Sequence, residues 1–418
     1  MRQVGIEAID SRLTPWHHRG MQTRKVIAFL SGSVVTLAAC TTTVAGDPTG
    51  TPSATSPDAG NPDAAAQVPI RKAPELGTGD HTAESVVLTE IAGPAAKLNK
   101  PRDLAFNTLR PDELWVVNWG DDSMVIVTDA STEQRTSERR KDSNANHFMA
   151  KPAAIAFGAD ATTIGKPGTF ATCGESRNTY DDQATANDFM GPALWSSDLS
   201  VFAKVNPHGL GSHLDMLHNT PLCMGIAHES DNAYWTFGGL KNSIDRYNFA
   251  LDHHIGQDDH SDGDSRQYIT GQVKYQAGVA SHVYYHAANK MLYIADSGNG
   301  RVVVLDTTTG TKGAKVRPKE PMGESVKMDN AVLTELVTAD SGQVTTPSGI
   351  EVWKDHVYVS DYATGRISAF TLDGELVNYL DTGLPTGGLA GMAFGPDGKL
   401  YFVDTVGSRV LRVDVAVK

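Results

Sequence analysis

The chain has 418 residues and a formal net charge of −13 at pH 7, with no stripe of basic residues. This charge balance argues against a nucleic acid as the partner. Glycine is abundant and no long segment has the periodicity of an amphipathic helix, so we expect an all-β protein.

The N-terminal segment has the pattern of an export signal. Arg24 and Lys25 precede a short apolar run, which is too short to anchor the chain in a membrane by itself. The run ends in Leu-Ala-Ala-Cys, which resembles the bacterial lipoprotein box and implies cleavage before Cys40 and lipidation of that residue. The alternative is an ordinary secreted protein with a small-residue cleavage site.

We therefore expect residues 1–39 to be a signal region, with the true start at Met21. Residues 40–80 are predicted to be the lipidated Cys and a flexible tether rich in Thr, Ser, Pro and Ala. The predicted location is the bacterial cell envelope, held to the membrane by the lipid. Thr41, rather than Asp, follows the Cys and favours the outer membrane if the cell has one.

Residues 84–418 repeat one pattern. A strand is followed by a tight turn, a second strand that ends in a small polar or acidic residue, and a third strand; five copies lie at 101–127, 224–249, 282–306, 347–374 and 389–415. A sixth, more decorated copy begins at Ala153. Repeats made only of strands predict the blades of a β-propeller. Six first strands are expected, near Arg102, Ala153, Met224, His282, Gly349 and Gly391.

The last blade ends without a fourth strand, whereas the segment Ser85 to Ile91 is a strand without a blade. We expect this segment to close the last blade and thereby remove the exposed sheet edges. The outer strands of the second blade are expected within residues 193–205.

Two cysteines remain beside Cys40. When the repeats are aligned, Cys173 falls near the end of a second strand and Cys223 just before the next first strand. These positions lie on one face of consecutive blades, so we predict a disulfide between them. The alternative is two separate thiols.

The pattern from Pro347 to Phe370 resembles the NHL repeat, whose family forms six-bladed β-propellers. The resemblance covers nearly all of the chain after Ser85. It implies a protein- or RNA-binding module, a sensor domain, or an enzyme. In the enzyme of this family, the peptidyl-α-hydroxyglycine amidating lyase, zinc-binding His residues lie at the starts of the first strands. Of the six matching positions only His282 is a His, so the lyase activity is not carried over.

Polar residues end several second strands, namely Asn118, Asp296, Asp361 and Asp404. A side-chain oxygen at that place accepts hydrogen bonds from the backbone of the following turn. We therefore predict a structural role for this set.

A segment rich in Asp and His follows the third copy of the pattern and forms an insertion. Its candidate metal ligands are His253, His254, Asp258, His260, Asp262 and Asp264. The alternating oxygen donors and Gly263 are typical of a calcium loop, although Ile269 stands where a closing Glu would be. A zinc or copper site using the His residues, or a solvated acidic loop without metal, are the alternatives.

The axial funnel is the other candidate site. We expect Arg102, Asn118, His218, His282 and His286 to point toward it. The predicted function is binding of a small-molecule ligand or protein partner on the axial face. The alternative is a metal-dependent lyase or hydrolase that uses His218 and His282 with Arg102 or an Asp.

Overall fold

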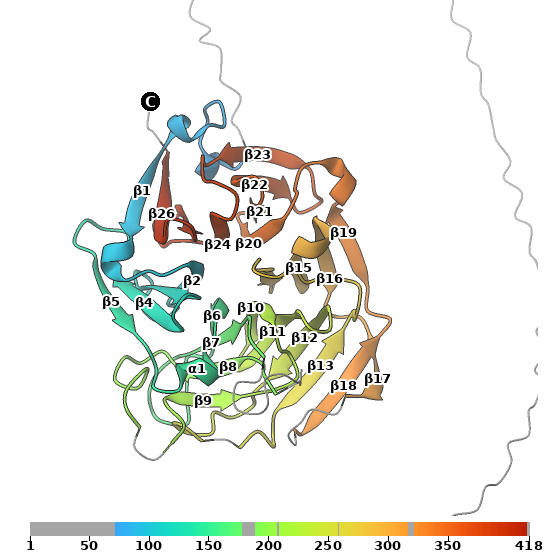
Figure 1. The fold of residues 1–418 in the computed structure, drawn as a ribbon. Helices are drawn as coiled ribbons and strands as arrows, with labels where there is room; N and C mark the ends of the chain where they lie inside the picture. The colour runs from blue at the N-terminus through green and yellow to red at the C-terminus, as the bar shows by residue number, and fades with distance from the viewer. Residues whose placement is uncertain (1–71, 178–188, 207–208, 258, 317–321, 416–418) are drawn as a thin grey trace, which may run out of the picture. The chain divides into compact units, whose positions relative to one another are not determined.

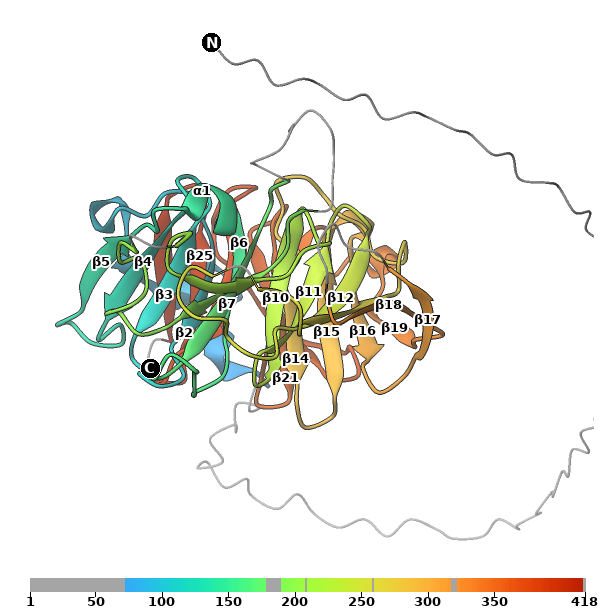
Figure 2. The ribbon, with the colours of Figure 1, turned by 90° about the horizontal axis from the view of Figure 1, so that it is seen from below.

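The structure, a computed structural model, describes residues 72–177, 189–206, 209–257, 259–316 and 322–415. Six β-sheets are arranged as the blades of a propeller around a central axis (Figure 1). Figure 2 shows the ring from its edge, with the strands running between the two faces.

Blade one consists of β2 (Pro101–Phe106), β3 (Leu114–Asn118), β4 (Ser123–Thr128) and β5 (Thr136–Arg140). Blade two consists of β6 (Pro152–Phe157), β7 (Thr169–Gly174), β8 (Ala193–Ser196) and β9 (His213–Met216). Blade three starts with β10 (Cys223–Ser230), β11 (Ala233–Gly238), β12 (Ser243–Asn248) and β13 (Asp264–Tyr268).

Blade four consists of β14 (Val283–His286), β15 (Met291–Asp296), β16 (Arg301–Asp306) and β19 (Leu333–Val337). Blade five consists of β20 (Pro347–Trp353), β21 (His356–Asp361), β22 (Arg366–Thr371) and β23 (Leu376–Asp381). Blade six consists of β24 (Leu389–Phe394), β25 (Leu400–Asp404), β26 (Arg409–Val415) and β1 (Val86–Ala92). The described helices are short: α1 (Ala145–Phe148), η1 (Pro74–Leu76), η2 (Ala83–Ser85), η3 (Pro94–Ala96), η4 (Ser297–Asn299) and η5 (Ala339–Ser341).

The inner strands are apolar because neighbouring blades cover both of their faces. Every residue of β3, β11 and β25 is buried, as expected for strands that lack a solvent face. The core therefore lies between blades. Between blades one and two, for example, the ring of Trp115 lies 4.9 Å from Phe170 and 5.2 Å from Phe202.

The ring closes as the sequence predicts. Strand β1 pairs antiparallel with β26, from Val86 opposite Val415 to Ala92 opposite Val410, and the two strands lie side by side in Figure 1. The chain before β1 is also attached to blade five, because the Asn378 amide donates to the backbone oxygens of Ala73 and Gly77. Closure thus joins the first and last described strands of the chain.

The fourth strand of blade two lies further along the chain than expected. It is β9, beyond residues 193–205, and only β8 falls within that range. Asp198 begins a helical turn instead, because its backbone oxygen accepts from both Val201 and Phe202 N–H. The turn buries Phe202 against Trp115, which explains why this apolar segment is not a strand.

Blade three carries two additional strands from another blade. The hairpin of β17 (Thr311–Lys315) and β18 (Glu324–Asp329) lies between β16 and β19 in the chain, yet β18 pairs parallel with β13. Asp264 is opposite Glu324 in this ladder. Asp264 therefore belongs to the sheet rather than to the loop that the sequence predicts. Among the described residues no helix is long and apolar enough to cross a membrane.

Candidate functional site

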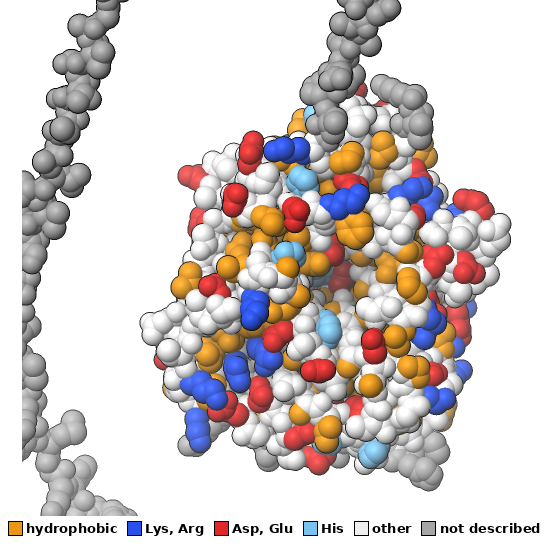
Figure 3. Space-filling model, turned by 180° about the vertical axis from the view of Figure 1, so that it is seen from behind, with side chains coloured by type: hydrophobic (Ala, Val, Ile, Leu, Met, Phe, Trp, Pro, Cys, Tyr) orange, Lys and Arg blue, Asp and Glu red, His pale blue; other side chains and the backbone are white. Residues whose placement is uncertain are grey.

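The axis of the ring contains a cavity of about 390 Å³ that is lined by the first strands of all six blades. It opens toward the face at which these strands end. Figure 3 shows that face, with acidic side chains inside a hollow near its centre. Its depth comes from the propeller geometry, in which the innermost strands converge.

At the inner end of the cavity, neighbouring first strands pack closely against one another. A Cβ at Gly391 would lie 2.1 Å from Asp103 Oδ1, and one at Gly225 would lie 2.3 Å from the backbone oxygen of Ser281. Only glycine allows strands to approach this closely. The two glycines therefore help to place Asp103 and His282, which follows Ser281, at the inner end of the cavity.

Asp103 is the first acidic group of the cavity. Its residue is 7% exposed, its Oδ2 accepts from Ile155 N–H at 3.0 Å, and its Oδ1 lies 3.6 Å from His282 Nδ1. Burial raises the pKa of this carboxyl, and the nearby His282 acts in the opposite direction. Asp103 is thus held by blade two and faced by blade four.

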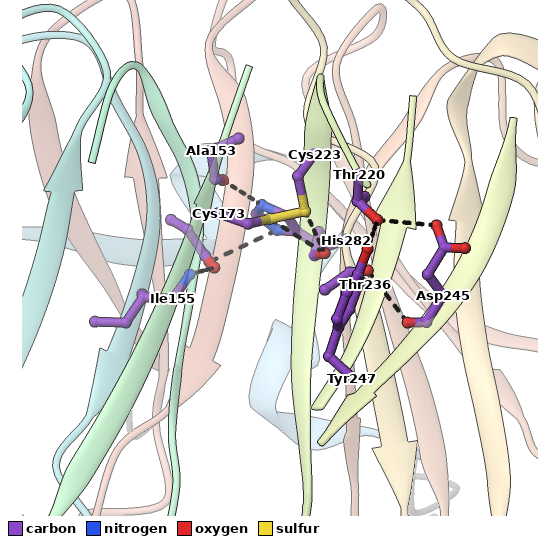
Figure 4. Close-up of a disulfide and its surroundings, with 11 residues drawn as sticks. Ala153, Ile155, Cys173, Thr220, Cys223, Thr236, Asp245, Tyr247 and His282 are labelled. Atoms are coloured by element: carbon purple, nitrogen blue, oxygen red, sulfur yellow. Dashed lines mark hydrogen bonds and ion pairs between the residues drawn. A yellow bond between two sulfur atoms is a disulfide. The ribbon is translucent and has the colours of Figure 1, made fainter. Parts of the chain in front are cut away.

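His282 uses both ring nitrogens toward protein groups. Its Nε2 lies 3.0 Å from the backbone oxygen of Ala153, as Figure 4 shows. A carbonyl oxygen only accepts, so Nε2 carries the proton and Nδ1 is directed toward Asp103.

Glu351 is the second acidic group. Part of the residue is open to the cavity, but desolvation of the carboxyl, together with the charge of Asp103, raises its pKa well above its usual range. The other walls are mainly apolar or aromatic, formed by residues that include Phe106, Phe157, Tyr284, Tyr285, Met392 and Phe394. The site is a cavity in which two carboxyl groups lie among aliphatic and aromatic side chains.

The structure separates the residues expected at the funnel. His282 lines the cavity, whereas His218 does not. His218 stacks on Phe189 at 4.1 Å and lies edge-on to His260 at 5.3 Å, because it follows β9, an outer strand, rather than a first strand. The expected pairing of His218 with His282 in one funnel is therefore not present.

The remaining funnel candidates also lie outside the cavity. Arg102 Nη1 donates to the backbone oxygen of Gly278 at 2.6 Å. Asn118 Oδ1 accepts from Asn99 N–H, and His286 lies beside Tyr293.

The candidate metal ligands of the acidic insertion contact several different partners. His260 Nδ1 lies 2.6 Å from Asp215 Oδ1, and His253 Nε2 lies 2.7 Å from Asp262 Oδ1. Asp264 is 3.8 Å from the Arg246 guanidinium, and His254 lies at a separate surface pocket. Asp258 lies outside the described residues. Over the described part of the chain, no three His, Cys, Asp or Glu side chains are placed to hold a metal ion.

The polar residues that end the second strands have the predicted structural role. Asp361 accepts from four backbone N–H groups in two adjacent turns. Asp296 accepts from Lys274 N–H and Asp404 from Gly407 N–H. The structural role is confirmed, although Asp296 and Asn118 hold the segment before the first strand of their blade rather than the following turn.

The predicted disulfide is present. Cys173 in β7 and Cys223 in β10 are bonded, with their Cα atoms 5.4 Å apart (Figure 4). The bond links blades two and three. His282 lies close to it, as the same view shows.

Sequence reasoning did not identify Asp103 and Glu351. Each is the only acidic residue of its first strand, in the sequences PRDLAF and PSGIEVW. A carboxylate within a strand that is otherwise buried is costly unless it has a partner or a function. A single acidic residue among apolar residues of a first strand was therefore the sequence feature that could have indicated this site.

No model of a known protein family matches the chain, and no curated protein sequence does. An auxiliary nutrient binding protein from Bacteroides ovatus is 14% identical, with 76% of this chain and 69% of that chain covered and a TM-score of 0.49. A luciferin-regenerating enzyme is 14% identical, covering 80% and 99%, with a TM-score of 0.48. A streptogramin B lyase is 12% identical, covering 80% and 99%, with a TM-score of 0.45. At these values the likenesses assign no ligand or activity to this chain.

Proposed function

We propose that the protein is a binding module whose axial cavity takes a small organic cation, an amine with an apolar part. The observation that carries this proposal is the pair of carboxyl groups of Asp103 and Glu351 inside a cavity that also presents aliphatic and aromatic side chains. Among the described residues that line the cavity, none is Lys or Arg. A cationic ligand supplies the missing counter-charge, and its apolar part contacts the aromatic walls.

The cavity favours a small molecule over a protein partner. Its volume of about 390 Å³ lies in the range of small-molecule sites. A protein partner would bury a much broader surface.

The geometry favours binding over catalysis. His282 is the candidate base of a lyase or hydrolase, but its Nε2 donates to Ala153 and its Nδ1 faces Asp103. A base needs a nitrogen within hydrogen-bond reach of the substrate. His282 instead faces Asp103 at 3.6 Å, which leaves the carboxyl groups to contact the ligand.

Calorimetric titration tests the proposal. The probes are tyramine, putrescine and choline, with neutral 4-ethylphenol as the isostere of tyramine. We expect saturable binding of at least one amine, weakened roughly tenfold or more by Glu351→Gln, since a hydrogen bond to a charged group contributes about 1.5–3 kcal/mol. Glu375→Gln, an exposed acid of the same blade, is the matched control.

Two results would contradict the proposal: no binding of any of these amines, or equal affinity in the wild type and Glu351→Gln. Titration with calcium, zinc and copper forms a separate arm. Saturable metal binding that Glu351→Gln and Asp103→Asn abolish would replace the amine with a metal ion at the same site.

We further propose that the propeller is exported and held at the cell envelope by a lipid on Cys40. The disulfide supports export, because such bonds persist in oxidising compartments. Cys40 itself lies outside the described residues. Cys40→Ser is expected to abolish acylation, which mass spectrometry of the mature N-terminus detects; an unlipidated wild-type protein would overturn this proposal.

A further inference from the structure

A group of basic residues lies at the end of the axis opposite the cavity mouth. Lys100 and Lys151 occupy the same position in consecutive blades, directly before β2 and β6. Their backbone φ angles are 49° and 47°, in the left-handed region that non-glycine residues seldom adopt. In both blades the residue directly before the first strand is thus a lysine with the same uncommon backbone conformation.

Three cations surround a single indole. The Trp119 ring lies 5.8 Å from Lys100 Nζ, 5.2 Å from Arg102 Cζ and 5.6 Å from Lys151 Nζ. We name these four residues the Trp119 cluster. Cation–π attraction to the shared ring offsets part of the repulsion among the three charges, and a bound anion would offset more of it.

The Glu175 carboxylate does not by itself neutralise the cluster. Glu175 Oε2 accepts from Trp119 Nε1, while its Oε1 accepts from the Tyr275 hydroxyl and from Gly278 N–H. Over the described residues, no ion pair within 4.0 Å joins Lys100, Arg102 or Lys151 to a carboxylate. Asp122 Oδ1 also accepts from the Lys151 backbone N–H at 2.8 Å. Two carboxylates against three cations still leave an excess of positive charge.

Arg102 adds a buried hydrogen-bond donor. The residue is 7% exposed, and its Nε has no hydrogen-bond partner among the described residues. Burial lowers the pKa of this guanidinium, and the charge of Glu175 opposes the change. A buried N–H of a charged group without a hydrogen-bond acceptor lowers the stability of the fold. A ligand oxygen that accepts from Arg102 Nε would restore this stability.

We propose that the Trp119 cluster binds an oxyanion, the carboxylate or phosphate group of a ligand. Guanidinium and ammonium groups together bind such anions through charge-assisted hydrogen bonds. This site is distinct from the axial cavity, since none of its four residues lines the cavity. The inference therefore does not rest on the proposed amine site.

The test is calorimetric titration of the protein with phosphate, acetate and citrate, with chloride at matched ionic strength as the control for screening. The key variant is the double change Lys100→Gln and Lys151→Gln, because both residues are exposed and the fold does not depend on their charges. Lys290→Gln with Lys327→Gln, also exposed, changes the net charge equally at distant positions.

We expect saturable binding of phosphate or of a carboxylate, weakened at least about tenfold in the Lys100 and Lys151 variant and unchanged in the control variant. Tighter phosphate binding identifies a phosphoryl ligand, and tighter acetate or citrate binding identifies a carboxylate; both support the site. The proposal is overturned if no oxyanion binds beyond the chloride control, or if both double variants lose affinity equally.

Discussion

His282 Nδ1 lies 3.6 Å from Asp103 Oδ1 and connects blade four with blade one at the inner end of the cavity. The same imidazole donates from Nε2 to Ala153 of blade two. The His282 side chain therefore connects blade four with blades one and two. Glu351 has no such partner among the described residues. The pKa of its carboxyl is therefore set by desolvation and by the charge of Asp103.

The pKa of Glu351 predicts how stability depends on pH. Its pKa is raised in the folded protein, so its stabilising contribution is complete below the unfolded value near 4.5 and is lost as the pH rises through the folded value. A pKa that differs by one between the folded and unfolded states corresponds to about 1.4 kcal/mol of stability. We expect Glu351→Gln to remove this loss of stability above pH 4.5 and to be more stable than the wild type at alkaline pH.

Urea denaturation at several pH values measures this difference. Glu375→Gln, exposed on the same blade, is expected to keep the wild-type profile. The assignment is wrong if Glu351→Gln shows the wild-type decline.

The closing strand predicts a graded response to N-terminal truncation. A protein beginning at Lys72 keeps all described contacts, whereas one beginning at Gly79 loses the buried Leu76 and the Glu75 carboxylate that accepts from the Tyr358 hydroxyl. A protein beginning at Gly93 also loses β1 and exposes the edge of β26. We expect melting temperatures to fall in that order, with the shortest protein prone to aggregation. Equal melting temperatures for the first and last of these would contradict the closure.

The disulfide predicts a loss of stability on reduction. Cys173 and Cys223 are separated by 50 residues in the chain, and closing a loop of this size typically stabilises by about 2–4 kcal/mol. Cys173→Ser with Cys223→Ser is expected to lower the free energy of unfolding by that amount, and reductant should then have no further effect. Peptide mapping without reductant should recover the two cysteines linked; free thiols in exported protein would show that the bond does not form.

The two acid–His pairs near the insertion are predicted to differ in strength. Asp215 is fully buried against His260, whereas Asp262 is 34% exposed against His253. Breaking a buried pair typically costs about 3–5 kcal/mol, and an exposed pair contributes about 1 kcal/mol or less. We expect Asp215→Asn to destabilise strongly and Asp262→Asn to have little effect in chemical denaturation. Similar losses for the two variants would mean that burial does not set their strengths.

The same residues give a prediction about metals. Because His260 and His253 already contact Asp215 and Asp262, we expect millimolar calcium, or zinc or copper, to leave the melting temperature unchanged. A rise that Asp262→Ala abolishes would instead establish a metal site in the insertion.

The sequence by itself determined the architecture. The six first strands, the closure by β1, the turn-capping acids and the Cys173–Cys223 bond were all predictable. The reason is physical: strands within a blade are mostly neighbours in the chain, so their pairing follows from a local, repeated pattern. Alignment of that pattern between copies then places the unpaired strand β1 and the two cysteines.

Apart from the Cys173–Cys223 bond, only the tertiary structure decided which side chains meet between blades. Asp103, His282 and Glu351 come from three blades, and β18 joins β13 of another repeat. His218, which the sequence placed beside His282, lies instead against Phe189. Contacts of this kind depend on how the blades pack around the axis, and a pattern confined to one repeat carries no information about the side chains opposite it.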